Sequence, residues 1–281
     1  FIFCIMVVVA VSIMIVKLNV SNDEKRIVLI GKTGVGKSAA ANTILGENKF
    51  ISELSSSSVT KKCHKAKGNV NGQKVAVIDT PGLFDTKEEQ IVIEAKIKLC
   101  ISLSAPGPHV FLVVVQLGRF TAEEKNTVEQ IQKIFGEQAS KYTMVLFTNG
   151  DRLRRGKKSI HDFVKDSPDL LNFIKATSGR YHVFDNEVHD PNQVNMLFEQ
   201  IDQLMTVNGE EYYTNEMLQA AERAIEEEKE RLMLQLKMSE QKARDRAERK
   251  NMFLKTGLAV AGGAAVTAAA ATVAVKACQL Q

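Results

Sequence analysis

The sequence predicts an α/β fold with a mostly parallel sheet and helices on both faces. Short apolar and β-branched runs alternate with amphipathic helical segments between residues 24 and 207. The run 110–115 is apolar without interruption, as expected for a central strand that is covered on both faces. The first run, 26–30, leads into a glycine-rich segment at 31–38 and then into a helix-forming segment that Gly46 closes.

Three further strands are predicted at 74–78, 142–147 and 181–184. The dipeptide Asn71-Gly72 before the first of them is typical of a tight hairpin turn, because both residues tolerate positive φ.

Two helices carry clear start signals. Thr121 with Glu124 forms a capping box, and Gly136 ends the helix that follows. Asp190 as N-cap with Pro191 at the first helical position begins the second helix, which continues with apolar residues at helical spacing.

The composition excludes some functions. The chain of 281 residues has a net charge of +4, which is too mild to indicate nucleic-acid binding. The cysteines have neither disulfide-framework nor zinc-site spacing, so the sequence indicates a reducing compartment. They are Cys4, Cys63, Cys100 and Cys278.

Both ends are apolar. Residues 1–20 are expected to be either a membrane anchor or an artefact at the start of the chain, and a cleaved secretory signal is the less favoured interpretation. Residues 254–276 are rich in Ala and Val, carry no charge between Lys255 and Lys276, and are predicted to anchor the chain in a membrane. An Ala-rich helix in water and prenylation at Cys278 remain alternatives.

This tail predicts localisation on the cytosolic face of an intracellular membrane, or otherwise in the cytoplasm. Between the α/β domain and the tail, residues 210–252 are predicted to form one long polar helix. Its apolar residues Leu218, Ile225 and Leu232 recur every seven positions. A short coiled coil and a helix folded back against the domain are both open.

The glycine-rich segment reads G-x-x-x-x-G-K-S, which is the P-loop pattern for nucleotide phosphates. Its glycines let successive backbone N–H groups point at the phosphates, and Lys37 adds a full cation that also makes it a catalytic candidate. The hydroxyl of Ser38 is placed to bind Mg²⁺. The predicted phosphate contacts are Gly31, Lys32, Thr33, Gly34, Val35, Gly36, Lys37, Ser38 and Ala39.

A second nucleotide element, Asp79-Thr80-Pro81-Gly82, ends a predicted strand, where open α/β sheets bind ligands. Asp79 is predicted to hold Mg²⁺ and the Gly82 N–H to meet the γ-phosphate. Between the two motifs lies a Ser-rich segment, 55–63. Thr60 in it is predicted to close on Mg²⁺ and γ-phosphate as the switch I hydroxyl. On sequence alone any of the preceding serines could take this role, and a flexible linker is the alternative.

Base recognition is predicted at Thr148-Asn149-Gly150-Asp151. The Asp151 carboxylate can accept two hydrogen bonds from guanine N1 and N2, which adenine cannot offer. The usual pattern is N-K-x-D, so Asn149 stands where a lysine normally stacks on the base. The domain 24–207 is therefore predicted to be a GTP-binding G domain, with GTP or GDP and Mg²⁺ as its ligands.

Several of these motifs together resemble the GTPases of immunity-associated proteins, the GIMAP or IAN family, which are septin-related P-loop GTPases. They are G-K-T-G-V-G-K-S-A-A-A-N-T-I-L-G, V-T-K-K-C, D-T-P-G-L-F-D-T, P-G-P-H-V-F-L-V-V-V-Q-L-G-R-F-T and Y-T-N-E-M-L-Q-A-A-E, within about residues 24–225.

The resemblance implies a GTP-binding domain that dimerises or polymerises across its nucleotide face, with itself or a related GTPase, and a C-terminal membrane tail. It implies the switch I role for Thr60 and a second guanine contact for Asn186. It also implies that Arg119 acts as a catalytic arginine in the partner's site, stabilising transition-state charge.

Hydrolysis is expected to be slow, because Leu83 follows the D-T-P-G motif where many GTPases have a glutamine that orients water. We therefore expect a self-associating GTP switch or scaffold whose slow turnover is stimulated by dimerisation. The alternative is a GTP-binding assembly module without significant turnover. An ATPase or small-molecule kinase is the least favoured, and only that class tolerates Asp151→Asn.

Overall fold

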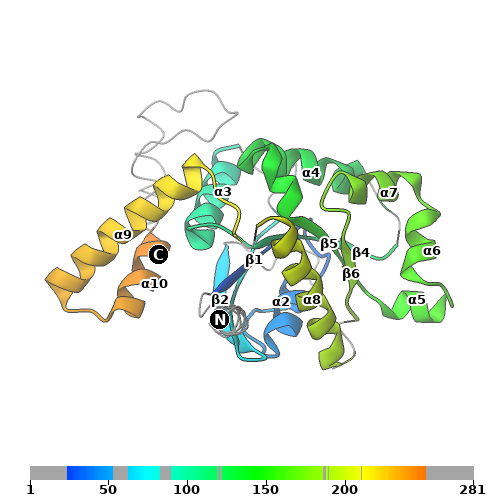
Figure 1. Ribbon diagram of the computed structural model, residues 1–281, viewed down its shortest axis with the longest axis horizontal. Helices are drawn as coiled ribbons and strands as arrows, with labels where there is room; N and C mark the ends of the chain where they lie inside the picture. Colours follow the sequence, from blue (N-terminus) through cyan, green and yellow to red (C-terminus); the bar gives the residue numbers. More distant parts are fainter. Residues whose placement is uncertain are drawn as a thin grey trace, which may run out of the picture.

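The computed structural model describes residues 24–52, 63–82, 90–118, 120, 122–185, 188, 190–209 and 211–250, with the backbone alone for residues 90–95, 122, 123 and 250. The described chain forms a six-stranded sheet in the order β2-β3-β1-β4-β5-β6 (Figure 1). Only β2 is antiparallel to its neighbour; β3, β1, β4, β5 and β6 run parallel. The strands are β1 Lys25–Ile30, β2 His64–Val70, β3 Gln73–Asp79, β4 Val110–Gln116, β5 Thr143–Thr148 and β6 Tyr181–Val183.

Helices cover both faces of the sheet, as the sequence predicts. On one face lie α2 (Lys37–Leu45) and α8 (Pro191–Val207), whose buried side chains form one apolar core with the sheet. The other face carries α3 (Gln90–Ser104), α4 (Ala122–Phe135), α7 (Pro168–Lys175), α9 (Glu216–Leu236) and α10 (Glu240–Lys250), which share a second core. The remaining elements are the 3₁₀ helix η1 (Glu137–Tyr142) and the short helices α5 (Asp151–Arg155) and α6 (Ile160–Lys165).

The local signals hold in detail. Asn71 and Gly72 turn the β2–β3 hairpin with φ of 52° and 84°, and Gly46 closes α2 with φ of 65°. Asp190 caps α8, its side chain accepting a hydrogen bond from the N–H of Asn192. Thr121, half of the predicted capping box, lies outside the described residues.

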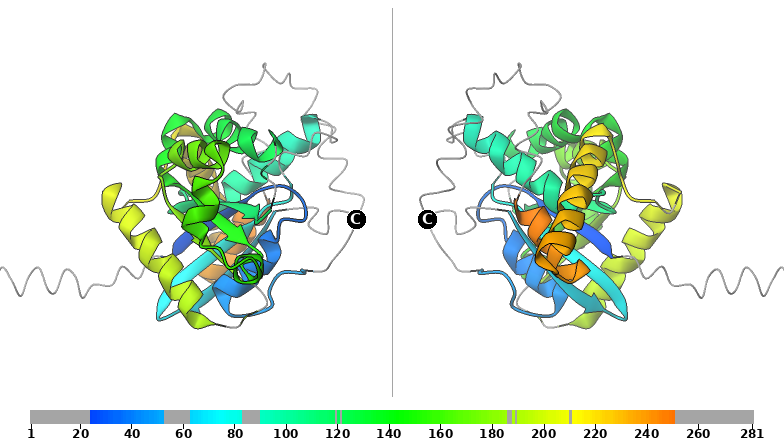
Figure 2. Two further views of the ribbon diagram at one scale, coloured as in Figure 1. Left: turned by 90° about the vertical axis from the view of Figure 1, so that its right-hand side faces the viewer. Right: turned by 90° about the vertical axis from the view of Figure 1, so that its left-hand side faces the viewer.

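The long helix predicted for 210–252 is wrong: this part of the chain forms two helices, α9 and α10. Lys237 ends α9 in the left-handed conformation with φ of 49°, and α10 then turns back (Figure 2, right). Leu218, Ile225 and Leu232 are at most 1% exposed and pack into the chain's own core. Of the two open interpretations, the structure therefore supports the one in which the segment folds back against the domain.

The predicted tail-anchored localisation must also be corrected. Among the described residues, no helix combines the length and the apolarity that crossing a membrane requires. The physical reason is plain in α9, which is 21 residues long but carries charged side chains along its whole length. The segments 1–20 and 254–276 and Cys278 lie outside the described residues.

Candidate functional site

The P-loop connects β1 to α2 at the carboxyl edge of the sheet, between the neighbouring strands β3 and β4. Gly31 runs so close to β4 that a Cβ there would lie 2.6 Å from the Val114 carbonyl oxygen. Gly36, with φ of 91°, precedes the first turn of α2, for which the described residues provide no side-chain cap. The sequence therefore builds a tight loop whose helix N-terminus can meet an anion.

The Lys37 side chain lies under this loop. Its Nζ donates hydrogen bonds to the carbonyl oxygens of Gly31 at 3.0 Å and Lys32 at 2.7 Å. Burial lowers the pKa of Lys37 to about 8, and the nearby Asp79 carboxylate opposes that shift only partly. The loop carbonyls thus hold the buried ammonium group of Lys37 at the position from which it would contact a bound phosphate.

Ser38 and Asp79 meet, although 41 residues separate them in sequence. The Ser38 hydroxyl donates to Oδ2 of Asp79 at 2.6 Å, and Asp79 is 1% exposed. The next residue, Thr80, donates its hydroxyl to the Leu29 carbonyl at 2.6 Å, which fixes the end of β3 against β1. Gly82 passes so near the P-loop that a Cβ there would lie 2.5 Å from Oγ1 of Thr33. A hydroxyl and a carboxylate oxygen side by side suit Mg²⁺, which prefers oxygen ligands.

The predicted base loop follows β5 at the same edge. The Thr148 hydroxyl donates to the Val35 carbonyl at 2.7 Å, so this loop is tied directly to the P-loop. Asn149 takes φ of 60°, and Asp151, 6% exposed, begins α5. One carboxylate oxygen of Asp151, Oδ1, is buried without a hydrogen-bond partner among the residues that the structure describes. A buried acceptor of this kind fits a ligand that brings N–H donors.

The loop after β6 lies against the base loop. The Gly150 N–H donates to the Phe184 carbonyl at 3.0 Å. Gln193 of α8 then holds this second loop: its Oε1 accepts from the Asp185 N–H at 2.8 Å, and its Nε2 donates to the Val188 carbonyl at 2.8 Å. The described part of this loop thus reaches the same edge as Asp151.

The structure therefore brings the P-loop, Asp79, Gly82 and the loop with Asn149 and Asp151 together at one edge. Three predicted site residues, Thr60, Arg119 and Asn186, lie outside the described residues, as does Leu83.

Several contacts at this edge were not predicted from the sequence. Lys32 of the P-loop pairs with the buried carboxylate of Glu124 in α4 at 3.3 Å. Arg152 donates from Nη1 to the Leu117 carbonyl at 2.6 Å. The run of three arginines in 152–155 was a possible signal for such contacts, whereas Gln193 lies in an ordinary amphipathic helix and gave none.

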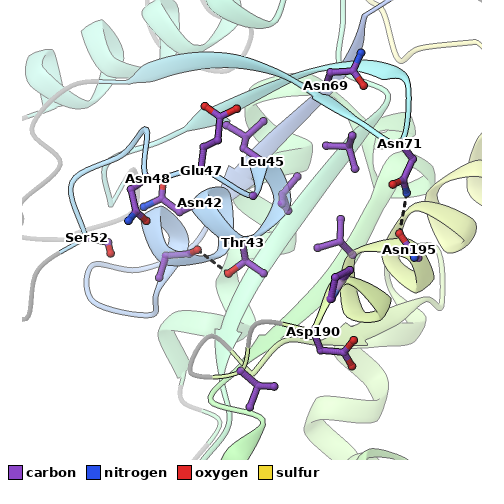
Figure 3. A pocket seen from close by; sticks show the side chains of 17 residues that line it. Asn42, Thr43, Leu45, Glu47, Asn48, Ser52, Asn69, Asn71, Asp190 and Asn195 are labelled. Carbon is purple, nitrogen blue, oxygen red and sulfur yellow. Dashed lines mark hydrogen bonds between the residues drawn. The ribbon is translucent and has the colours of Figure 1, made fainter.

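A cleft of about 520 Å³ is lined by α2, the β2–β3 hairpin and the start of α8 (Figure 3). Of the predicted phosphate contacts, Ala39 lines it. Several asparagines that line the cleft form hydrogen bonds within the protein. Nδ2 of Asn71 in the hairpin donates to Oδ1 of Asn195 in α8 at 2.7 Å, and Oδ1 of Asn42 accepts from the Phe50 N–H at 2.8 Å. The first contact ties the hairpin to α8, and the second ties α2 to the segment that follows it.

The chain has the fold of a P-loop GTPase. This follows from the order of the strands in the sheet, the P-loop and the loops at the carboxyl edge. Two crystal structures of Toc33 from Arabidopsis thaliana, a dimerisation-deficient mutant and a complex with GDP and Mg²⁺, have the same fold. Their TM-scores are 0.52 and 0.51, with 20% and 21% sequence identity. They cover 65% and 68% of this chain, and the matches span 85% and 88% of the Toc33 chains.

The AIG1 family model matches residues 25–232, and the chain belongs to the AIG1 family. It is 37% identical over 221 residues to immune-associated nucleotide-binding protein 7 of Arabidopsis thaliana, covering 75% of this chain and 70% of that protein. It is 35% identical over 197 residues to human GTPase IMAP family member 8. That match covers 69% of this chain but only 29% of the human protein. The family resemblance that the motifs indicated is thereby confirmed.

Proposed function

We propose that this edge of the sheet binds a guanine nucleotide together with Mg²⁺. The observation that carries the proposal is the 2.6 Å hydrogen bond between Ser38 and Asp79, because it joins two oxygen ligands beside the ammonium group of Lys37. The names of the relatives support it, since the human protein is called a GTPase and the Arabidopsis protein a nucleotide-binding protein.

Each residue has a role in this proposal. Lys37 and the N–H groups of the P-loop bind the phosphates, and Mg²⁺, once bound, neutralises charge on the phosphate oxygens. Asp151 accepts from the guanine edge. The proposed phosphate contacts are Gly31, Lys32, Thr33, Gly34, Val35, Gly36, Lys37, Ser38, Ala39 and Gly82. The proposed metal ligands are Ser38, Thr60 and Asp79, and the proposed base contacts are Asn149, Asp151 and Asn186.

The protein is further proposed to hydrolyse GTP slowly and to associate through its nucleotide face, with itself or a related GTPase. In the sequence, Arg119 follows shortly after β4, which ends at the same edge of the sheet. The carbonyl of Leu117, two residues before Arg119, accepts a hydrogen bond from Arg152. An arginine at this edge can reach a neighbouring molecule's site and stabilise charge on the transferring phosphate there. The dimer is therefore the faster catalyst.

The alternative is an assembly module that binds GTP without significant turnover. Leu83 favours it, because an apolar side chain cannot orient the attacking water as the usual glutamine does. Under this alternative, GTP binding alone builds the dimer surface.

Turnover of GTP by the full chain, measured across a concentration series, distinguishes the two. A dimer catalyst shows turnover per molecule that rises with concentration, and Arg119→Ala removes that rise, with a loss of about 10³-fold or more. Flat and negligible turnover with tight GTP binding supports the assembly module. Asp151→Asn is the specificity test: loss of the acceptor lowers GTP affinity by about a hundredfold if guanine is the base.

A further inference from the structure

The short helix α5, labelled in Figure 1, begins at Asp151. Each of its three arginines contacts a different part of the candidate site. Arg152 donates to the Leu117 carbonyl at the end of β4. Arg154 pairs with Asp185 in the loop after β6. Arg155 pairs with Asp151 itself, with 2.8 Å between Nη2 and Oδ2. The single turn of α5 thus contacts the end of β4, the loop after β6 and the predicted base-binding carboxylate of Asp151.

The pair of Arg155 with Asp151 makes the two carboxylate oxygens unequal. Oδ2 is held by the guanidinium group, whereas Oδ1 is buried without a partner among the described residues. The Asp151 side chain is 8% exposed and that of Arg155 is 74% exposed. The arginine therefore approaches from solvent and grips the outer oxygen of a carboxylate that is otherwise enclosed.

Such a pair contributes little to the stability of the fold. Exposed ion pairs four residues apart on a helix are typically worth only a few tenths of a kcal/mol. Its consequence is instead geometric, because the contact of Nη2 with Oδ2 fixes one end of the carboxylate and so limits its rotation about its last torsion. Guanine offers two donors, N1–H and the N2 amino group, and a carboxylate meets both only when its plane lies in the plane of the base.

We propose that Arg155 is a positioning residue that sets the preference for guanine, by holding the Asp151 carboxylate oriented toward both donors of the base. This inference rests on the proposed binding of guanine nucleotides.

The test compares GDP with inosine diphosphate, which lacks the N2 amino group, by calorimetric titration of the full chain freed of nucleotide. A freely rotating carboxylate still meets one donor but seldom two. Arg155→Gln therefore lowers GDP affinity about fivefold and inosine diphosphate affinity less than about twofold. Arg155→Lys recovers part of the preference. Lys165→Gln, the same charge change at an exposed position on α6, leaves both affinities unchanged.

The inference is overturned if Arg155→Gln has the same ratio of GDP affinity to inosine diphosphate affinity as the natural chain. This holds whether both affinities are unchanged or both fall by the same factor. The second case means only that the arginine supports the loop or attracts the nucleotide by charge. Asp151→Asn separates this from failure of the proposed function. If Asp151→Asn abolishes GDP binding while the Arg155→Gln ratio is unchanged, only the inference is wrong; if Asp151→Asn leaves GDP affinity intact, guanine recognition itself is wrong.

Discussion

At the scale of single residues, the charge of Lys37 predicts a pH dependence of nucleotide binding. In the free protein, burial lowers the pKa of Lys37 from 10.5 to about 8. Its ammonium therefore loses its proton as the pH rises through about 8, and binding a phosphate has to restore that proton. Affinity is full below about pH 7 and falls above it, by about fourfold between pH 7 and pH 8.5. Titration of GDP at a series of pH values measures the slope.

Lys37→Arg is the matched control, because a guanidinium group keeps its proton throughout this range. Its absolute affinity is expected to be lower, since the loop carbonyls of Gly31 and Lys32 are placed for an ammonium group. Its profile between pH 7 and pH 8.5 should be flat. If the natural chain shows the same flat profile, the ammonium group of Lys37 is not titrating at the phosphate site.

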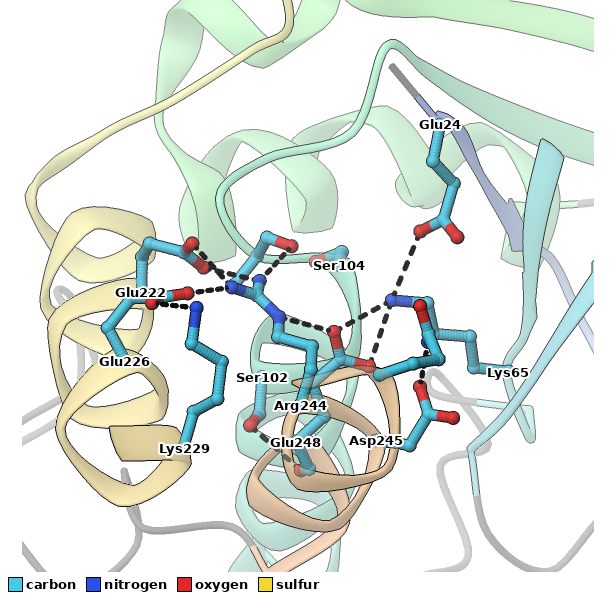
Figure 4. A network of polar contacts seen from close by, with 12 residues as sticks. Glu24, Lys65, Ser102, Ser104, Glu222, Glu226, Lys229, Arg244, Asp245 and Glu248 are labelled. Carbon is cyan, nitrogen blue, oxygen red and sulfur yellow. Dashed lines mark hydrogen bonds and ion pairs between the residues drawn. The ribbon is translucent and has the colours of Figure 1, made fainter. Parts of the chain in front are cut away.

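At the scale of elements, α10 depends on ion pairs to an unusual degree. Its only fully buried apolar side chains are two alanines, Ala243 and Ala247, within the described part of the chain. Arg244 makes up for this small apolar contact: its guanidinium group bonds to Glu222 and Glu226 of α9 and to Glu248 (Figure 4). These carboxylates raise the pKa of Arg244 despite its burial.

A second group of charges ties α10 to the edge strand β2. Nζ of Lys65 lies 2.9 Å from Oε2 of Glu248 and 3.5 Å from Oε1 of Glu24, and both members of the first pair are almost fully buried. The network thus joins α9, α10, β2 and the start of β1. Because buried pairs must offset their desolvation, removing one partner is more harmful than the pair is stabilising.

We therefore expect Arg244→Ala to lower the free energy of unfolding by about 3 kcal/mol, because it removes the partly buried cation that bridges Glu222, Glu226 and the buried Glu248 and leaves Glu248 with Lys65 alone. Urea unfolding measures this loss. Hydrogen exchange should show faster exchange in residues 240–250 while the central strands stay protected. Arg246→Ala, an exposed arginine on the same helix, should leave both readouts unchanged. A loss as large in Arg246→Ala would mean that net charge on α10, rather than the network around Arg244, holds the helix.

At the scale of the whole molecule, the sequence predicted the parts of the fold that are encoded locally. The strand runs, the turn at Asn71-Gly72 and the cap at Asp190 each depend on neighbours in the chain, and the structure confirms them. The P-loop could likewise be predicted from the sequence, because its residues are consecutive in the chain. Contacts such as Thr148 with Val35, or Arg155 with one oxygen of Asp151, depend on side-chain directions that periodicity does not encode.

The prediction that failed at long range was that residues 210–252 form one helix, because the structure has α9 and α10 instead. The polar composition did not show that many charges of these two helices pair with one another. Tyr213 ties the segment to the sheet, with its N–H donating to the Pro108 carbonyl at 2.8 Å and its hydroxyl bonding to the Phe135 carbonyl. A spacing of seven residues places apolar side chains on one face of a helix without saying whether that face meets a second chain or its own domain.

This shared core predicts that the chain cannot be divided at the G-domain boundary. Leu218, Ala221, Ile225 and Leu232 belong to the same apolar core as α3, α4 and the sheet. Burying the three larger ones contributes on the order of 5–8 kcal/mol, which is comparable to the net stability of a typical domain. A chain ending at Asn208 should therefore fail to unfold cooperatively, whereas one ending at Lys250 should melt as the full chain does, both followed by circular dichroism. A chain ending at Leu236, which lacks only α10, should fold but melt earlier. If the chain ending at Asn208 melts cooperatively within a few degrees of the full chain, α9 lies on a domain that is already complete without it.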